Sequence, residues 1–346
     1  MRDIEPILQK IRDTVKSHKL AAEGQYSRYL HFIPEGETLR LNEYGVADAA
    51  NILYSLGDFS ASPLFREGFV DAFAALQDPT TGLFREPTHF PVHTTAHCTA
   101  ALELFDRRPA PPKDLLPYIN KEKLYELLES LEWVKSPWNN SHIGAGIYVS
   151  LMLSGVAGRD FENDYFAWLW EEADPETGLW RKGCVNQPGA APLYHHMAGS
   201  FHYLFNHEYA CRPLRYPDKM IDCNLEMYRT PGALPANFAT TCGFIQIDWI
   251  FCLTRASRQT PHRFHEVKAA LRRFANDYFD YLEAVDPTKD KSFDDLHALF
   301  GTVCAIAELY RALPGEFTAA KPPKLVLDRT LHLINVHIIY KEVGQC

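Results

Sequence analysis

The chain has 346 residues, a formal net charge of -9, and a composition that is 46% hydrophobic and 13% aromatic. This supplies ample material for a large core, and the acidic balance disfavours nucleic acid or an anionic membrane as a partner, since either would favour a basic face. No run approaches the roughly 20 apolar residues that would span a bilayer.

Six segments share one design, a polar N-terminal end followed by an apolar body. In chain order they are 42–57, 91–105, 140–155, 194–209, 240–256 and 294–309. The segments can be aligned on one residue near the start of each, which is expected to face the centre of the molecule. These residues are Tyr44, His93, His142, His196, Phe244 and His297, and by subtraction they are 49, 49, 54, 48 and 53 residues apart. Near-equal spacing of this kind is typical of a repeat architecture.

The stretches between these segments are apolar on one face only, which predicts helices that lie half in water. They are 4–20, 63–77, 115–133, 162–172 and 267–282, with a short helix inside the irregular segment 213–235 and a last helix or outer layer at 325–340. Buried helices that alternate with amphipathic ones predict an inner ring sheathed by an outer ring. We therefore expect an all-α fold, an (α/α)6 toroid, as a single domain over residues 1–346.

Two connectors are near-copies, DPTTGLF at 78–84 and DPETGLW at 174–180. Asp followed by Pro favours a tight turn, and Gly82 or Gly178 supplies the positive φ that ends it. Each turn leads from an outer helix to an inner one, so these loops are expected at one mouth of the ring, where binding residues usually gather. The polar loop 183–192 is a candidate cover for that mouth.

The N-terminal residues and the cysteines indicate in which cellular compartment the protein is expected. The first twenty residues carry charge throughout and lack the apolar core of a secretory signal. The eight cysteines are scattered and mostly lie in apolar helix bodies, where they behave as small hydrophobes. We expect reduced thiols and a cytoplasmic location, and leave a homodimer open.

Asp48 and Asp248 are the strongest catalytic candidates, because both lie inside apolar helices where a capping role is impossible. Burial raises the pKa of a carboxyl group, so a buried pair suits general acid and base chemistry. Histidines at the same rim suit proton abstraction next to a carbonyl. The candidate catalytic residues are Asp48, His93, His97, Asp248 and His297.

Candidate substrate-binding residues are the polar side chains beside these positions and the aromatic side chains of the mouth loops, which could stack on a sugar ring. They are Glu43, Tyr44, Trp138, Asn140, His142, Trp180, His196, Asp294 and Asp295. Asp294 and Asp295 have the alternative role of capping the last inner helix, where a carboxylate meets free N–H groups.

A metal site is a separate hypothesis. His93 and His97 are one helical turn apart, so two ligands could share one face, with Asp48 completing the set. The glutamate of the zinc-protease helix is absent between them, and no pair of closely spaced cysteines exists. We expect no cofactor, with a divalent metal ion as the alternative.

The hairpin repeat with its Asp-Pro-x-Thr-Gly-Leu-Phe/Trp turns resembles the six-hairpin glycosidase superfamily, which includes unsaturated uronyl hydrolases and the N-acylglucosamine 2-epimerase group. The resemblance covers nearly the whole chain as architecture and implies a carbohydrate-active enzyme, either a glycoside hydrolase or a sugar isomerase or epimerase. In the uronyl hydrolases, aspartates at the starts of inner helices are catalytic, whereas this chain has His93 and His142 there. This difference favours histidine-based isomerisation of a sugar.

Two other function classes stay open. Terpenoid cyclases and protein prenyltransferases have the same alternation of helices, and a late inner helix with His297 and Cys304 is similar to the latter. The Asp-x-Cys ligand pair is absent, however, because Asp222 and Cys223 are adjacent, and no DxDD sequence occurs. The third class is a non-catalytic ring that binds a ligand; it predicts buried partners for both Asp48 and Asp248 and a mouth filled by residues 183–192.

Overall fold

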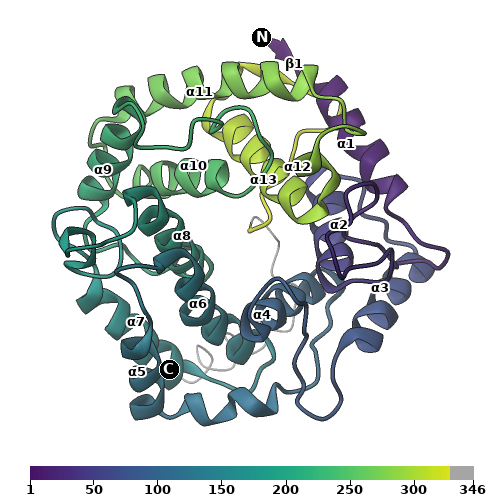
Figure 1. Ribbon diagram of the computed structural model, residues 1–346, viewed down its shortest axis with the longest axis horizontal. Helices are drawn as coiled ribbons and strands as arrows, with labels where there is room; N and C mark the ends of the chain where they lie inside the picture. Colours follow the sequence, from purple (N-terminus) through teal and green to yellow (C-terminus); the bar gives the residue numbers. More distant parts are fainter. Residues whose placement is uncertain (328–346) are drawn as a thin grey trace, which may run out of the picture.

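The computed structural model describes residues 1–327 and consists almost entirely of helices, which confirms the all-α prediction (Figure 1). The larger helices are α1 (Glu5–Ser17), α2 (Glu43–Ser55), α3 (Pro63–Leu76), α4 (Pro91–Leu102), α5 (Lys121–Ser130), α6 (Pro137–Leu153), α7 (Arg159–Glu172), α8 (Leu193–Tyr209), α9 (Pro217–Arg229), α10 (Ile245–Ala256), α11 (Phe264–Ala284) and α13 (Leu296–Ala312). The shorter elements are β1 (Arg2–Asp3), η1 (Glu103–Phe105), η2 (Lys113–Ile119), η3 (Cys184–Asn186), α12 (Lys291–Asp294) and β2 (Phe317–Thr318). The predicted segment 325–340 lies largely outside the described residues.

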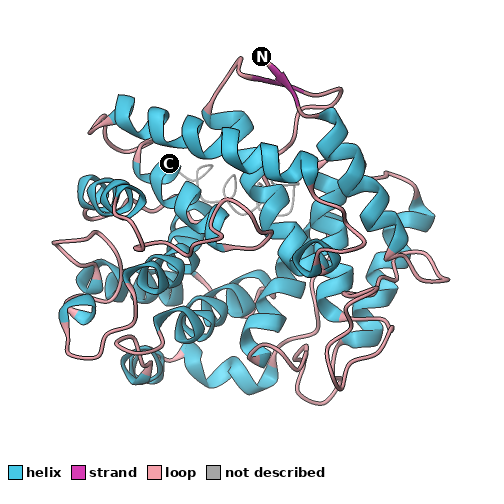
Figure 2. Cartoon of the chain, turned by 45° about the horizontal axis from the view of Figure 1, so that its top comes forward, coloured by secondary structure: helices cyan, strands magenta, loops and turns pink. Residues whose placement is uncertain are grey.

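Within residues 1–327, six helices surround the centre of the molecule. They are α2, α4, α6, α8, α10 and α13; each packs against the next, and α13 packs back against α2. The helices α1, α3, α5, α7, α9 and α11 lie outside them in Figure 1. Figure 2 shows the loops that link these helices and the short strand β1 near the N-terminus.

The inner and outer helices differ in how many of their faces are buried. In α10 nearly every residue is buried, whereas in α1 only Ile7, Leu8, Ile11 and Val15 are, on one stripe. Burial of a leucine or isoleucine side chain contributes about 1.5–3 kcal/mol, so a one-sided stripe is enough to attach an outer helix. The sequence pattern thus separates the two kinds of helix correctly.

Two outer elements differ from the prediction. The stretch 115–133 is divided into the 3-10 helix η2 and the α-helix α5, because Pro117 lies inside η2 and cannot donate a backbone hydrogen bond. The segment 213–235 contains α9, a full outer helix of 13 residues.

The two Asp-Pro turns are anchored in the same way. The amide of Gly82 donates to the carbonyl of Asp78, and the amide of Gly178 donates to that of Asp174, each at 2.8 Å. Both glycines have positive φ. The amide after each turn donates to a hydroxyl on the next inner helix, Phe84 to Thr95 and Trp180 to Ser200. The repeated motif therefore fixes each turn to its inner helix.

The close approach of a loop to α2 gives a stability prediction. A Cβ atom on Gly45 would lie 2.6 Å from the carbonyl oxygen of Tyr26 and 2.8 Å from the amide nitrogen of Arg28. Backbone cannot yield as a side chain does, so Gly45→Ala is expected to reduce the free energy of unfolding by about 1–3 kcal/mol. Urea unfolding would measure the change. Gly158→Ala is the control, since its Cβ meets nothing within 4 Å; an equal loss in both variants would contradict the argument.

Two further observations concern the described part of the chain. None of its helices has the length and apolarity needed to cross a membrane. Its seven cysteines are free thiols, and the cytoplasmic location stays a prediction.

Candidate functional site

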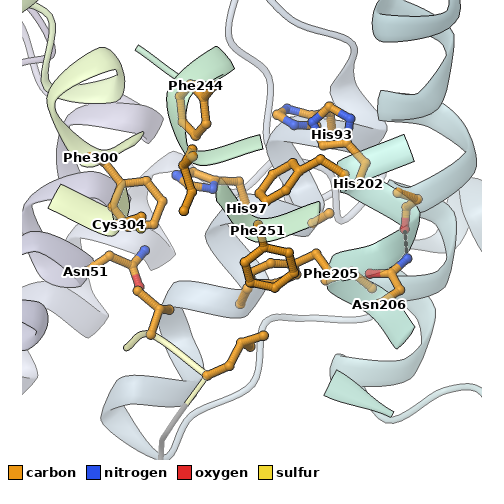
Figure 3. Close-up of a pocket in the computed structure, with 18 of the residues that line it drawn as sticks. Asn51, His93, His97, His202, Phe205, Asn206, Phe244, Phe251, Phe300 and Cys304 are labelled. Carbon is orange, nitrogen blue, oxygen red and sulfur yellow. Dashed lines mark hydrogen bonds between the residues drawn. The ribbon is translucent and has the colours of Figure 1, made fainter. Parts of the chain in front are cut away.

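A cavity of about 720 Å³ lies among the inner helices, and its wall includes side chains from all six of them. No residue of the loop 183–192 lines this cavity. The structure therefore does not support the prediction that this loop fills the mouth. Figure 3 shows part of the wall, with His93, His97 and His202 near Phe205 and Phe251.

The carboxyl group of Asp48 lies between two imidazoles of the cavity wall. Its Oδ1 is 2.6 Å from Nε2 of His97, and its Oδ2 is 3.0 Å from Nδ1 of His297. Asp48 itself is fully buried, while both histidines line the cavity. The carboxyl group therefore does not contact the cavity itself, and the two imidazole rings lie between it and the cavity.

The helix starts place these three groups together. Asn42 caps α2 by accepting from the amides of Tyr44 and Gly45, which puts Asp48 little more than one turn into the helix. Asp295 caps α13 by accepting from the amide of His297. Because α2 packs against both α4 and α13, residues near the N-terminal ends of these helices meet.

Burial controls the charge of this cluster. It raises the pKa of Asp48 to about 6, and it lowers the pKa of His297 well below its usual value. At neutral pH the favoured state is an ionised Asp48 that accepts one N–H bond from Nε2 of His97 and one from Nδ1 of His297. The other nitrogens of the two rings, Nδ1 of His97 and Nε2 of His297, have no protein hydrogen-bond partner within residues 1–327.

Three more histidines form a second cluster in the cavity wall. These are His93, His142 and His202, whose ligand nitrogens all lie within 4.8 Å of one another. The predicted metal set of His93, His97 and Asp48 is therefore divided, since His97 and Asp48 group with His297 instead. Tyr44 joins the two clusters: its hydroxyl is 2.7 Å from Nδ1 of His93, and its ring packs against those of His97 and His297.

A buried arginine completes this end of the cavity. Arg28 donates from Nε and Nη2 to the two carboxylate oxygens of Asp295, at 2.7 and 2.9 Å, and from Nη1 to Glu86 at 3.1 Å. Although burial opposes its charge, the hydrogen bonds to Asp295 raise the pKa of Arg28. Asp295 is thus both the predicted helix cap and a cavity residue.

The middle of the cavity is apolar, and its far end is charged. Five phenylalanines line the wall: Phe201, Phe205, Phe244, Phe251 and Phe300. At the C-terminal ends of the inner helices, Arg255 lies 2.8 Å from Glu308 and 3.1 Å from Glu208. A bound molecule would meet polar groups at both ends and aromatic rings between them.

Asp248 and His196 do not line this cavity, so the prediction that both side chains face the centre of the molecule is wrong. Both side chains are fully buried, and within residues 1–327 neither the carboxylate oxygens nor the imidazole nitrogens have a hydrogen-bond partner. Burial raises the pKa of Asp248 well above its usual range and lowers that of His196 to about 4. Other positions of the same helices line the cavity instead, His202 in α8 and Phe251 in α10.

Trp180 and Asn140 are also away from the cavity wall. The Trp180 ring is buried, and its indole N–H donates to the carbonyl of Leu169 at 2.7 Å. Asn140 donates to the carbonyl of Ser136 and accepts from the amide of Glu132. Both residues stabilise local structure, whereas Trp138 and His142 line the cavity as expected for binding residues.

Glu43 and Asp294 lie beside the site and not on the cavity wall. Burial raises the pKa of Glu43 to about 7, and Arg40 lies 3.9 Å away. Asp294 accepts from the amides of Leu30, His31 and Phe32, so it holds the loop that carries Arg28 and does not cap α13.

Replacement of Asp248 is expected to stabilise the chain, whereas most substitutions of buried residues destabilise a protein. A buried polar group without a partner costs about 1–3 kcal/mol, so Asp248→Val is expected to increase the free energy of unfolding by a similar amount. Thermal unfolding at neutral pH would measure it. The matched variant is Asp48→Val, which leaves two imidazole N–H groups unpaired and is expected to destabilise the chain; a lower melting temperature for Asp248→Val would contradict the description of its surroundings.

Arg28, His89 and His202 line the cavity beside the two histidine clusters and were not among the sequence-based candidates. Arg28 and His89 lie in loops, where no periodicity indicates which way a side chain points. His202 lies six residues after His196 in α8, on a different side of the helix. The several histidines of α8 indicated that one of them could face the cavity, but their spacing did not show which one.

Comparison of the chain with protein-family models, curated proteins and solved structures gives no match. The arrangement of residues around the cavity is therefore the basis for any statement about function.

Proposed function

We propose that this chain is an enzyme that performs general acid–base chemistry on a small molecule bound in the central cavity. The observation that carries the proposal is the Asp48 carboxyl group held between His97 and His297 at the cavity wall. A carboxylate behind an imidazole fixes its tautomer and stabilises its protonated form.

His97 and His297 would be the catalytic residues, and Asp48 would position them. One imidazole takes a proton from the substrate through its cavity-facing nitrogen, and the resulting imidazolium is stabilised by the Asp48 carboxylate. Return of the proton by the same ring to a second atom of the substrate is an isomerisation. Return of a proton by the other ring to the same carbon, from its opposite face, is an epimerisation.

A sugar is the substrate class that we propose for the polar end. Trp138 offers a face for stacking, and Asn139 and Arg28 add polar groups to the wall. Glycoside hydrolysis needs two carboxyl groups on opposite sides of the scissile bond. Asp248 lies away from the wall and Asp48 behind two histidines. The carboxylates of Asp295 and Glu308, which line the cavity, are paired with Arg28 and Arg255. The geometry therefore favours a sugar isomerase or epimerase over a hydrolase.

The five phenylalanines favour a second candidate, an isoprenoid or other apolar substrate. Aromatic faces attract cationic centres, such as those that form during isoprenoid cyclisation. Cys304 and His297 both line the cavity, whereas Asp222 pairs with His262 and Arg263 and does not. A substrate with a polar group at one end and an apolar body would contact both kinds of wall.

The test is a set of three assays with the full chain. Reducing sugars in deuterated water are followed by NMR for exchange at the carbon next to the carbonyl, aryl glycosides for release of the aryl group, and isoprenoid diphosphates with magnesium for new hydrocarbon products. We expect deuterium incorporation whose rate Asp48→Asn lowers by at least about 100-fold. Products from the diphosphates alone would favour the second candidate, and binding without turnover in every assay would overturn the proposal in favour of the non-catalytic ring.

A further inference from the structure

The second histidine cluster takes one residue from each of three consecutive inner helices. His93 belongs to α4, His142 to α6 and His202 to α8. The ring centroids of His93 and His142 are 4.2 Å apart, and those of His142 and His202 are 4.7 Å apart. In a tetrahedral zinc site the nitrogens are about 3.3 Å apart, since each Zn–N bond is about 2.0–2.1 Å. Small side-chain rotations would therefore bring the three nitrogens, now within 4.8 Å, around one ion.

The hydrogen bonds of His202 determine which of its nitrogens carries the proton. Its Nδ1 is 2.9 Å from the hydroxyl oxygen of Ser141, and that hydroxyl donates its hydrogen to the carbonyl of Trp138 at 2.6 Å. The hydroxyl has no second hydrogen to donate, so Nδ1 of His202 must be the donor and Ser141 the acceptor. Nε2 of His202 is then unprotonated and has a free lone pair.

His93 is held in a similar way, with its Nδ1 2.7 Å from the hydroxyl of Tyr44. Metal-binding histidines almost always have their second nitrogen bonded to a protein group, which fixes the ring and its tautomer. His142 differs, because neither of its nitrogens has a protein hydrogen-bond partner within residues 1–327. A polar ring without a partner, facing two oriented imidazoles, is the arrangement that a shared cation would satisfy.

The surroundings keep the three rings in the form that binds metal. Burial, followed by the neighbouring histidines, lowers the pKa of His93 and His142 well below the usual value, and it lowers that of His202 to about 3. All three are neutral at pH 7, as a metal ligand must be. In the other cluster, Nε2 of His97 and Nδ1 of His297 are already bonded to Asp48.

We propose that His93, His142 and His202 bind a divalent transition-metal ion, with zinc as the probe, at the wall of the cavity. Three imidazoles suit zinc, copper, nickel or iron and do not suit magnesium or calcium, which prefer oxygen ligands. Three protein ligands leave one tetrahedral position open toward the cavity, as in catalytic zinc sites. The proposal does not depend on the proposed proton-transfer activity, since it concerns binding.

The test is calorimetric titration of the chelator-treated full chain with zinc chloride at pH 7.5. We expect one equivalent to bind, magnesium not to bind, and zinc to raise the melting temperature. His142→Ala is the main variant because that ring has no protein hydrogen bond to lose within residues 1–327, and His202→Asn is the second. Each is expected to weaken zinc affinity at least tenfold while the circular dichroism spectrum stays unchanged.

The matched controls are His265→Ala, which removes an exposed histidine on α11, and Asp48→Asn in the other cluster. Both are expected to retain zinc affinity within about twofold. Absence of zinc binding to the original chain, equal affinity in His142→Ala, or loss of binding in Asp48→Asn would each overturn the proposal.

Discussion

Acidification from about pH 7.5 to about pH 5, in the presence of a chelator, is expected to unfold this chain with a midpoint at about pH 5 to 6. The cause is a set of histidines whose pKa burial lowers in the folded state. They are His18, His93, His142, His196, His202, His207 and His297.

The sign follows from which state binds more protons. Above about pH 6.5 these imidazoles are neutral in both states, so their contribution to stability is complete. As the pH falls below that value, the unfolded chain takes up protons that the folded chain does not, and each group costs about 1.4 kcal/mol per pH unit until its folded pKa is reached. The folded pKa is about 3 for His202 and about 4 for His196 and His207.

Three buried carboxyl groups act in the opposite direction. Burial raises the pKa of Asp48 to about 6, that of Glu43 to about 7 and that of Asp248 well above its usual value. As the pH falls, the folded chain binds protons on these groups before the unfolded chain does, which favours the folded state. They are fewer than the histidines, so the net effect is a loss of several kcal/mol per pH unit, against a typical total stability of about 5–15 kcal/mol.

Circular dichroism and tryptophan fluorescence along a pH titration would measure the midpoint. His207→Phe is the informative variant, because His207 is buried against Phe166 and Trp180, and its loss is expected to move the midpoint to lower pH. His265→Asn is the control and should leave the midpoint unchanged. A midpoint below about pH 4, where ordinary carboxylates titrate, would contradict the argument.

The second large effect is expected for Asp48→Asn, which should lower the turnover number by about 100-fold to 10,000-fold with little change in KM. The asparagine amide donates where the carboxylate accepts, so it forces His97 or His297 into the other tautomer. The nitrogen that faces the cavity then carries a hydrogen and cannot act as a base.

Nitrogen NMR of the two imidazoles would detect the change of tautomer independently of any substrate. Asp248→Asn is the matched control: it makes the same chemical change on a buried inner helix, but away from the cavity wall, so turnover should stay within about twofold of the original. Equal losses of turnover in both variants would show that Asp48 acts through stability alone.

The arrangement of the helices could be predicted from the sequence, but the orientation of every side chain could not. Buried and amphipathic helices alternate with a repeat near fifty residues, and that pattern predicted the inner and outer helices well. Alignment on the helix starts also brought Tyr44, Asp48, His93, His97 and His297 into one group. The structure places these residues close together because the N-terminal ends of neighbouring inner helices meet.

The errors at His196 and Asp248 have a single physical cause. A helix that is buried all round has no polar stripe to show which face points inward, so a choice of register rests on spacing alone. In α8 the histidine that lines the cavity is His202, and the aromatic residues that line it from α10 and its N-cap are Phe251 and Phe244. Arg28 could not be predicted because its position depends on a loop that Gly45 and Asp294 hold against α2 and α12.

The bond between Asp48 and His297 joins the first inner helix to the last, across 249 positions of the chain. Contacts of such sequence separation form late in folding, since the entropy of closing a long loop opposes them until the intervening helices are in place. A chain still emerging from the ribosome would therefore have Asp48 and His97 in place before His297 of α13 joins them. The proposed proton-transfer activity would appear only after α13 docks, and its time course would report the closure of the ring of inner helices.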